Sequence, residues 1–300
     1  MNLTPKQIKL FLALVETQSV TAAARACHVT QPTASMQLRA IAEVVGLPLY
    51  EISGRQFRLT DAGEALAATL LQVEHTWEGF QQSIAGLRGL ERGRLRVAVV
   101  STAKYFVPQF LADFCRAHPQ IDVSLEVLNR DGVVSRLRRH QDDLYVMSHP
   151  PEDLALATHA LMPNKLLLVA PQGHRLSGKG RLKWSELRNE KWIVREAGSG
   201  TRWAMEQAFA RAGFTPPAPM VLGSNEAIRG AVAGGMGVAV LSEHALPGGP
   251  AQHGLVALQA PGFPIPAQWF AVHPTQQALA PIALAFLQHI LKLASASRMA

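Results

Sequence analysis

The sequence predicts an α/β protein that begins with an all-α winged helix-turn-helix and continues into a two-lobed α/β domain. Two short helices separated by a tight turn occur within residues 1–60, and one long amphipathic helix follows them. From Arg94 onward, apolar strands alternate with helices to the end of the 300-residue chain. Since a single core stops growing below this length, more than one domain is expected.

The first predicted helix begins after Thr4. Pro5 then takes the first helical position, and Gln7 completes a capping box with Thr4. The apolar residues that follow are spaced to form one helix face: Ile8, Phe11, Leu12 and Val15.

An alanine-rich segment at residues 20–27 and a second segment at residues 31–41 predict two helices that cross at a tight turn. Pro32 suits the opening turn of the second helix, and the other early positions of that helix are short and polar. Such a helix end can read the DNA major groove and offer backbone N–H groups to phosphate. The alternative is an ordinary three-helix core with a polar exposed face.

A short extended segment from Arg55 to Thr60 predicts a wing, and Asp61 then opens a helix of about 28 residues. Its apolar residues recur at alternating spacings of four and three, the pattern of a coiled-coil seam. They are Leu66, Leu70, Val73, Trp77, Phe80, Ile84 and Leu87. This period favours a partner helix and hence a dimer, while the alternative is packing against the chain's own core.

The remainder predicts two sets of strands and helices, mostly parallel sheets, with a ligand between two lobes. The expected strands cover residues 95–100, 123–128, 144–147, 166–170, 192–194, 238–241 and 268–272. The expected helices cover residues 108–118, 133–139, 201–212, 227–233 and 281–293.

Two loops that follow predicted strands carry anion-binding chemistry. The first places Ser101, Thr102 and Lys104 before a helix, and the second runs from Arg195 to Arg202 around Gly198-Ser199-Gly200-Thr201. Hydroxyls, free backbone N–H groups and cationic side chains at helix starts are suited to an anion. Either loop alone is better explained as an ordinary capped helix start, but two of them in one expected cleft of a basic domain favour ligand binding.

The net charge of +7 and the isoelectric point near 9.8 indicate anionic partners. Residues 1–60 hold six basic and three acidic groups, and residues 61–93 hold two and five. The rest holds 21 basic and 14 acidic groups, so the surplus lies in the α/β part.

Several classes of protein are not expected. There is no export signal and no apolar stretch of about 20 residues, so we expect a cytoplasmic protein without a membrane span. Cys27 and Cys115 stand alone, and no metal-ligand, phosphate-loop or nucleophile motif occurs, so no catalytic residue, metal or cofactor is predicted.

Residues 1 to about 90 resemble the DNA-binding head and linker helix of LysR-type transcriptional regulators. The resemblance rests on Phe11, Ala22 to Ala24, Thr30-Gln31-Pro32, Ser35, Leu38, Gly46, Leu49, Arg58 to Thr60, Ala62 and Gly63. It implies a winged helix-turn-helix at residues 1–60, a dimerisation helix at 61–90 and an effector-binding domain at 94–300, built like the bilobed periplasmic binding proteins. Lobe I would hold residues 94–163 and 269–300, and lobe II residues 164–268.

The resemblance also implies which residues meet DNA. They are Thr30, Gln31, Pro32, Thr33, Ser35, Arg39 and, in the wing, Arg55. Met36 stands where many members carry a basic or other polar residue. The implied partners are double-stranded DNA with inverted half-sites and a second copy of the chain as a dimer or dimer of dimers, with RNA polymerase left open.

Further motifs lie in the effector domain: Ser101 to Pro108, Asn129-Arg130, Asp143-Leu144, Pro150-Pro151, Arg195-Glu196, Gly198 to Arg202, Met205-Glu206, Asn225 to Ile228, Ala233-Gly234 and Gly237. In these motifs the chain resembles the CbbR branch of the family, which regulates carbon-fixation operons and responds to anionic metabolites. The implied ligand-binding residues are Ser101, Thr102, Lys104, Ser148, His149, Arg195, Ser199, Gly200, Thr201, Arg202, Asn225 and Glu226. Ser148-His149 stands where that branch usually has a glycine and an arginine, so the fixed charge is lower. The chain is thus interpreted as a ligand-responsive regulator sensing a small anion such as a sugar phosphate. The alternatives are a regulator that senses sulfur oxyanions, and an α/β binding protein or enzyme with a helical oligomerisation arm.

Overall fold

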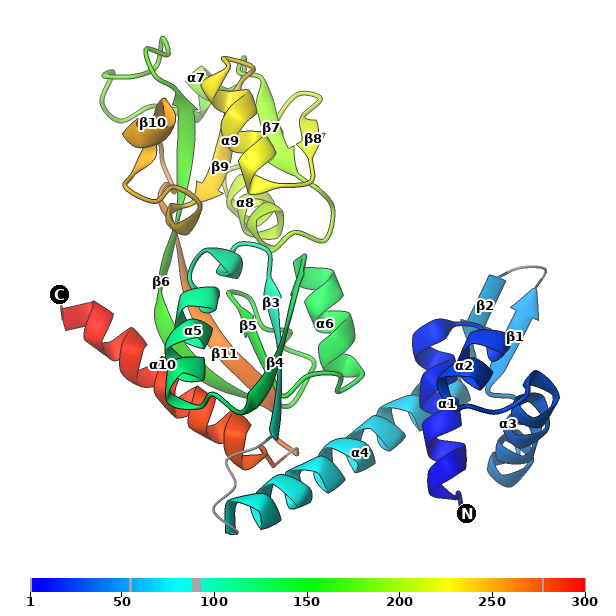
Figure 1. The fold of residues 1–300 in the computed structure, drawn as a ribbon. Coiled ribbons are helices and arrows are strands. Elements are labelled where there is room, and N and C mark those ends of the chain that lie inside the picture. Colours follow the sequence, from blue (N-terminus) through cyan, green and yellow to red (C-terminus); the bar gives the residue numbers. More distant parts are fainter. Residues whose placement is uncertain (1, 54–55, 88–92, 277, 300) are drawn as a thin grey trace.

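The computed structural model describes residues 2–53, 56–87, 93–276 and 278–299. Figure 1 shows an N-terminal head, a long helix that leads away from it, and an α/β domain of two lobes stacked one above the other. The long helix passes beneath the lower lobe, and the C-terminal helix packs along that same lobe.

The head consists of α1 (Pro5–Thr17), α2 (Val20–Ala26) and α3 (Gln31–Val45), followed by a hairpin of β1 (Tyr50–Ser53) and β2 (Gln56–Leu59). The capping box expected at Thr4 is present, because its hydroxyl accepts from Gln7 N and its own N–H donates to Gln7 Oε1. The fully buried face of α1 is Leu10, Phe11 and Leu14, while Ile8, Leu12 and Val15 are only partly buried. The small residues Ala23, Ala24 and Ala34 are buried where α2 and α3 pack, which lets these helices approach closely.

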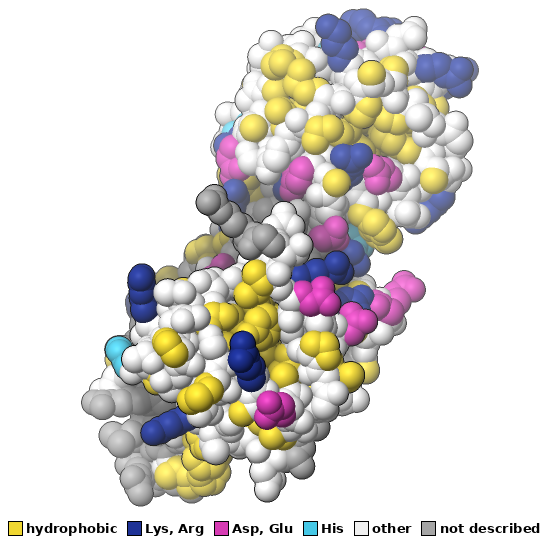
Figure 2. Space-filling view, turned by 90° about the vertical axis from the view of Figure 1, so that its right-hand side faces the viewer, with side chains coloured by type: hydrophobic (Ala, Val, Ile, Leu, Met, Phe, Trp, Pro, Cys, Tyr) yellow, Lys and Arg dark blue, Asp and Glu magenta, His cyan; other side chains and the backbone are white. Residues whose placement is uncertain are grey.

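Figure 2 looks at the molecule from the side of the head. Lys and Arg side chains are spread singly over this end of the molecule, and hydrophobic side chains lie between them. The face of the head seen in this view therefore has a mixed surface rather than one continuous basic patch.

Helix α4 (Asp61–Leu87) is a single helix, as expected from the sequence. Its first turns complete the head, because Ala67 and Leu70 are buried in the head core. Farther along, Val73, Trp77 and Phe80 are 51%, 60% and 53% exposed, so these three do not pack against the chain's own core. The side chain of Leu87 lies outside the described residues.

Hydrogen bonds between Arg96 and Glu78 join α4 to the α/β domain. The Arg96 guanidinium donates to both carboxylate oxygens of Glu78, at 2.7 and 2.9 Å. Arg96 lies in the first strand of the α/β domain, so the linker helix is attached directly to the sheet.

The sheet corrects one expectation. Its strands are β3 (Gly93–Val100), β4 (Ile121–Leu128), β5 (Leu144–Met147), β6 (Leu156–Pro171), β7 (Trp192–Arg195), β8 (Met220–Leu222), β9 (Val238–Ser242), β10 (Leu255–Ala257) and β11 (Ile265–Pro274). Parallel pairing occurs toward the two ends, but β6 and β11 pair antiparallel along the middle and join both sets into one nine-stranded sheet. The prediction of mostly parallel sheets was wrong in this respect, because β6 and β11 run through both lobes and pair antiparallel with each other and with their neighbours β5, β9 and β10.

The lower lobe of Figure 1, here called lobe I, contains β3, β4 and β5 with α5 (Val107–Ala117), α6 (Arg130–Arg138) and α10 (Pro281–Met299). Helices α5 and α10 pack on one face and α6 on the other. Lobe II contains β7 to β10 with α7 (Trp184–Leu187), α8 (Gly200–Arg211) and α9 (Asn225–Ala233). Each lobe has its own core on both faces of the sheet, and β6 and β11 connect the two.

Candidate functional site

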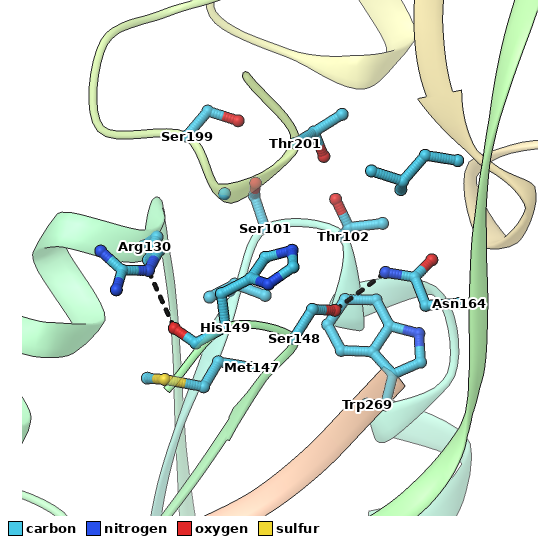
Figure 3. A pocket seen from close by; sticks show the side chains of 13 residues that line it. Ser101, Thr102, Arg130, Met147, Ser148, His149, Asn164, Ser199, Thr201 and Trp269 are labelled. Atoms are coloured by element: carbon cyan, nitrogen blue, oxygen red, sulfur yellow. Dashed lines mark hydrogen bonds between the residues drawn. The ribbon is translucent and has the colours of Figure 1, made fainter. Parts of the chain in front are cut away.

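A pocket lies between the lobes, where β3 and β5 of lobe I end opposite the start of α8 of lobe II (Figure 3). Its cavity volume is about 20 Å³, which is room for about one water molecule. The residues that line it are Val100, Ser101, Thr102, Arg130, Met147, Ser148, His149, Asn164, Leu166, Ser199, Gly200, Thr201 and Trp269.

Hydroxyl groups from both lobes meet in this pocket. Figure 3 shows Ser101 and Thr102 from lobe I facing Thr201 from lobe II. Ser101 Oγ accepts from Arg195 at 3.0 Å, and Thr102 Oγ1 accepts from Asn225 at 3.1 Å. Because each hydroxyl oxygen accepts a hydrogen bond from a residue outside the pocket, its own O–H remains available to donate to a ligand.

The start of α8 adds backbone donors. Ser199 occupies the N-cap position with extended backbone angles, but its side chain makes no capping hydrogen bond. The first N–H groups of a helix have no intrahelical acceptor, and the helix dipole is positive at this end. This end of α8 therefore favours an anion.

Arg130, the first residue of α6, supplies the fixed positive charge among the described residues that line the pocket. Its Nε donates to the carbonyl of His149 at 2.9 Å, which holds the side chain across the end of β5. Its guanidinium also lies 5.9 Å from the ring centroid of Trp203 in α8. Arg130 thus contacts both lobes at the mouth of the site.

His149 is a neutral donor or acceptor rather than a cation. Burial, followed by the neighbouring Arg130 guanidinium, lowers the pKa of His149 to about 4. Its ring lies 4.7 Å from the Trp203 ring, again across the two lobes. Where a guanidinium would add charge, this chain provides an imidazole that is uncharged at neutral pH.

We predict that His149→Gln weakens the acid sensitivity of folding. The unfolded imidazole takes up a proton near pH 6.5 whereas the folded one resists until about pH 4, so stability is lost as the pH falls between these values. Between pH 7 and pH 5 the wild type should lose about 2 kcal/mol more of its free energy of unfolding than the variant. Urea unfolding at the two pH values measures this difference, and parallel pH curves would contradict it.

Arg195 and Asn225 lie behind the pocket rather than on its surface. Arg195 is only 2% exposed, and its guanidinium is neutralised by Glu196 through contacts of 2.7 and 2.9 Å. It also donates to Asn225 Oδ1 at 2.7 Å, and the two together hold the hydroxyls of Ser101 and Thr102. Arg195 and Asn225, which the sequence predicted among the ligand-binding residues, do not line this pocket, but they contact the two hydroxyls that do.

Lys104, Arg202 and Glu226 also lie off the pocket surface. Lys104 Nζ is 3.0 Å from Glu226, and the Tyr105 hydroxyl donates to the same carboxylate at 2.7 Å, which joins the lobes at the surface. Burial would raise the pKa of Glu226, but the hydrogen bonds from Tyr105 and Lys104 outweigh it and lower the pKa to about 2. Arg202 pairs with Glu206 and lines a neighbouring pocket of about 200 Å³.

Seven of the twelve predicted ligand residues therefore line the pocket: Ser101, Thr102, Ser148, His149, Ser199, Gly200 and Thr201. Sequence reasoning missed Arg130, Asn164 and Trp269 as candidates. Asn164 is 3% exposed and lies between the Ser148 and Ser242 hydroxyls, at 2.8 and 2.7 Å. The available signal in the sequence was a polar residue just before the apolar run that begins at Leu166. That signal points to the pocket only once it is known where β6 passes from one lobe to the other.

The second candidate site is α3 of the head. Gln31, Pro32 and Arg39 are exposed, whereas Thr33 and Ser35 are half-buried. Thr30 caps α3 by accepting from the N–H of Thr33. Arg55 lies outside the described residues, so the structure says nothing of this predicted wing contact.

Two features are absent from the part of the chain that the structure describes. No group of three or more His, Cys, Asp or Glu side chains is arranged to hold a metal ion. Among the helices described, none has both the length and the apolar character required to cross a bilayer.

Comparison with known families connects both sites. Residues 5–64 match the bacterial regulatory helix-turn-helix protein model of the LysR family, and residues 88–295 match the LysR substrate binding domain. The chain belongs to the LysR family of transcriptional regulators. The predicted helix-turn-helix head and two-lobed α/β effector domain are confirmed by these matches.

Curated relatives of this LysR-type regulator confirm the resemblance to the CbbR branch. It is 40% identical over 287 residues to a RuBisCO operon transcriptional regulator of Acidithiobacillus ferrooxidans, covering 96% of this chain and 93% of the relative. It is 34% identical to the regulator CbbR of Rhodospirillum rubrum, covering 94% of each chain.

A solved structure is similar to the effector domain. The regulatory domain of CcmR from Synechocystis PCC6803, in complex with 2-PG, is 39% identical with a TM-score of 0.65. The match covers 68% of this LysR-type regulator and 98% of that domain.

Proposed function

We propose that this LysR-type regulator binds a small phosphorylated carboxylate, with 2-phosphoglycolate as the first candidate, in the pocket between its lobes. The relative CcmR is described in complex with 2-PG, and its regulatory domain is 39% identical. The observation that carries the proposal is the meeting of Ser101, Thr102, Thr201 and Arg130 at the start of α8.

The donor set suits a phosphate group. Three hydroxyls and the first N–H groups of α8 can each donate to a phosphoryl oxygen, and Arg130 adds a permanent charge. Asn164 offers an amide on the crossing strand, but its two ends already bond Ser148 and Ser242. It is therefore suited to holding the pocket's shape.

The small cavity gives the mechanism. A volume of about 20 Å³ is too small for a phosphorylated metabolite, and an adjoining pocket of about 200 Å³ shares Arg130 and Ser199 with it. We infer that the lobes or their side chains move so that the ligand occupies the space between them. A ligand that binds the two arrangements with different affinities shifts the population between them. The contact of Arg96 with Glu78 would pass such a shift from the sheet to α4 and the head.

We further propose the domain limits and partners of this regulator. The head would span residues 1–60, the linker helix 61–90 and the effector domain 94–300, with lobe I at 94–163 and 269–300 and lobe II at 164–268. The exposed stripe of Val73, Trp77 and Phe80 supports dimerisation through α4, which would place two heads on inverted half-sites. A dimer of dimers and contact with RNA polymerase are further proposals.

We infer that the protein acts in the cytoplasm and is not an enzyme, in keeping with relatives that are transcriptional regulators.

Calorimetric titration of the full-length protein with 2-phosphoglycolate tests the ligand. We expect saturable binding that Arg130→Gln and Thr201→Val each weaken, by about 10- to 100-fold for the charged contact. Arg138→Gln is the matched control, because Arg138 lies on the same helix and pairs with Asp153 at the surface. Binding of sulfate or thiosulfate in place of 2-phosphoglycolate would make the pocket a sulfur-oxyanion site, and equal affinity of Arg130→Gln would remove Arg130 from it.

A further inference from the structure

The outward face of α3 is apolar at its centre. The buried residues Ala34, Leu38 and Ile41 define the side of α3 that packs into the head. At 3.6 residues per turn, the opposite side of the helix is occupied by Pro32, Met36 and, two turns after Met36, Glu43. Met36 is 65% exposed, the largest exposed fraction among the large hydrophobic side chains of the described residues.

Polar groups near this centre are already engaged. The Thr30 hydroxyl lies 2.8 Å from the Thr33 hydroxyl and also caps the helix. Gln31 Nε2 donates to Ser35 Oγ at 3.1 Å, one turn along the same side. The side chain that projects between them without a polar group is Met36, and Figure 2 likewise shows hydrophobic side chains between separate basic ones on this end of the molecule.

We propose that Met36 reads the methyl group of a thymine in the major groove and is a specificity-determining residue of the head. In the major groove the thymine C5-methyl is the one apolar feature, whereas the other bases present donors and acceptors. A thioether over those polar edges would leave them without partners, which costs free energy, so Met36 discriminates in favour of thymine. The long, unbranched Met side chain can adjust to the methyl position.

DNA is the partner that fits this surface, because the residues belong to a matched helix-turn-helix model and Arg39 is exposed one turn away on α3. The proposal rests on DNA binding by the head and is independent of the effector. A competing use of Met36, as a contact with another protein, is an outcome that the test below separates.

Selection from a random duplex library tests the proposal without a known operator. Full-length wild type and Met36→Ala are each used to enrich binding sequences. We expect wild type to fix a thymine in each half-site that Met36→Ala leaves variable, while the other fixed positions stay the same. Met36→Leu should retain the thymine, because it keeps an apolar side chain of similar volume.

Removing the methyl group alone sharpens the test. Replacing the selected thymine by deoxyuridine should weaken binding by wild type about fourfold, the effect of one buried methyl group, and should not weaken binding by Met36→Ala further. Replacing the T·A pair by C·G should weaken wild type, and 5-methylcytosine at that site should recover part of the loss.

Two controls guard the interpretation. Met236→Ala removes another exposed methionine, 46% exposed and located in lobe II, and should leave the selected sequences unchanged. Equal thermal unfolding of wild type and Met36→Ala shows that the head is intact. The proposal is overturned if wild type and Met36→Ala show the same thymine preference, or if deoxyuridine does not weaken binding by wild type. It is also overturned if Met36→Ala loses binding to another protein while its base preference stays unchanged.

Discussion

Replacing Gly63 by alanine is expected to abolish DNA binding by unfolding the head. A Cβ at this position would lie 1.8 Å from the carbonyl oxygen of Leu49 and 3.2 Å from Leu59 Cδ2. The obstructing atom belongs to the backbone, so no side-chain rotation relieves it. Thr60 fixes the same backbone by donating to the carbonyls of Leu49 at 3.1 Å and Pro48 at 2.6 Å. We expect a loss of about 3 kcal/mol or more in the stability of the head.

The matched control lies in the same helix. A Cβ on Gly79 would lie 3.6 Å from the Cβ of Ala280, an ordinary contact, so Gly79→Ala should be tolerated or stabilise α4 by up to about 1 kcal/mol. A gel-shift titration measures DNA binding, and the thermal transition of the effector domain should remain in both variants. Normal DNA binding by Gly63→Ala would contradict the close approach of α4 to residue 49.

The head was predictable because its signals are local. Thr4, Pro5 and Gln7 specify the start of α1 within four residues, and the alanines of α2 specify a close helix crossing. The heptad pattern of α4 was only partly informative. Ala67 and Leu70 are used by the head core, so the exposed seam starts at Val73. A pattern in sequence does not say which turns a neighbouring domain will cover.

The residues that line the pocket between the lobes were predictable where they follow a strand directly. Ser101 and Thr102 follow β3, and Ser199, Gly200 and Thr201 lie at the start of α8 after β7. All five line the pocket. This holds because the carboxyl ends of parallel strands, with helix starts beside them, are where α/β sheets collect ligands.

The rest of the site could not be predicted, because it depends on contacts between distant parts of the chain. Arg195 was predicted as an anion contact, but Glu196 and Asn225 surround its guanidinium once β7 and α9 pack together. Trp269 reaches the pocket from β11, which returns from lobe II more than 100 residues after β5. The first half of β6 is half-exposed, so it lacks the continuous apolar run that identified its second half.

The second large effect is expected for Arg195→Ala. Its side chain is 2% exposed and donates to Glu196, Asn225 and Ser101, so its removal leaves a carboxylate and two polar groups without their partner. Because the Glu196 side chain is 27% exposed and can be hydrated, we expect a cost near the lower end for a buried ion pair, about 3 kcal/mol. For a domain of this size the midpoint of thermal unfolding should fall by roughly 10 °C.

Lys104→Ala provides the comparison, because the Lys104 ion pair with Glu226 also joins the lobes but lies at the surface, with side chains 34% and 42% exposed. Such a pair contributes about 0–1 kcal/mol.

Arg195→Ala should in addition weaken 2-phosphoglycolate binding, since Ser101 loses the group that turns its hydroxyl toward the pocket. DNA binding by the head should persist below the new transition. If Arg195→Ala were no more destabilising than Lys104→Ala, the buried contacts of Arg195 would contribute no more to stability than the exposed ion pair. The closed arrangement of the lobes would then depend on the contacts of Arg130 and His149 with Trp203.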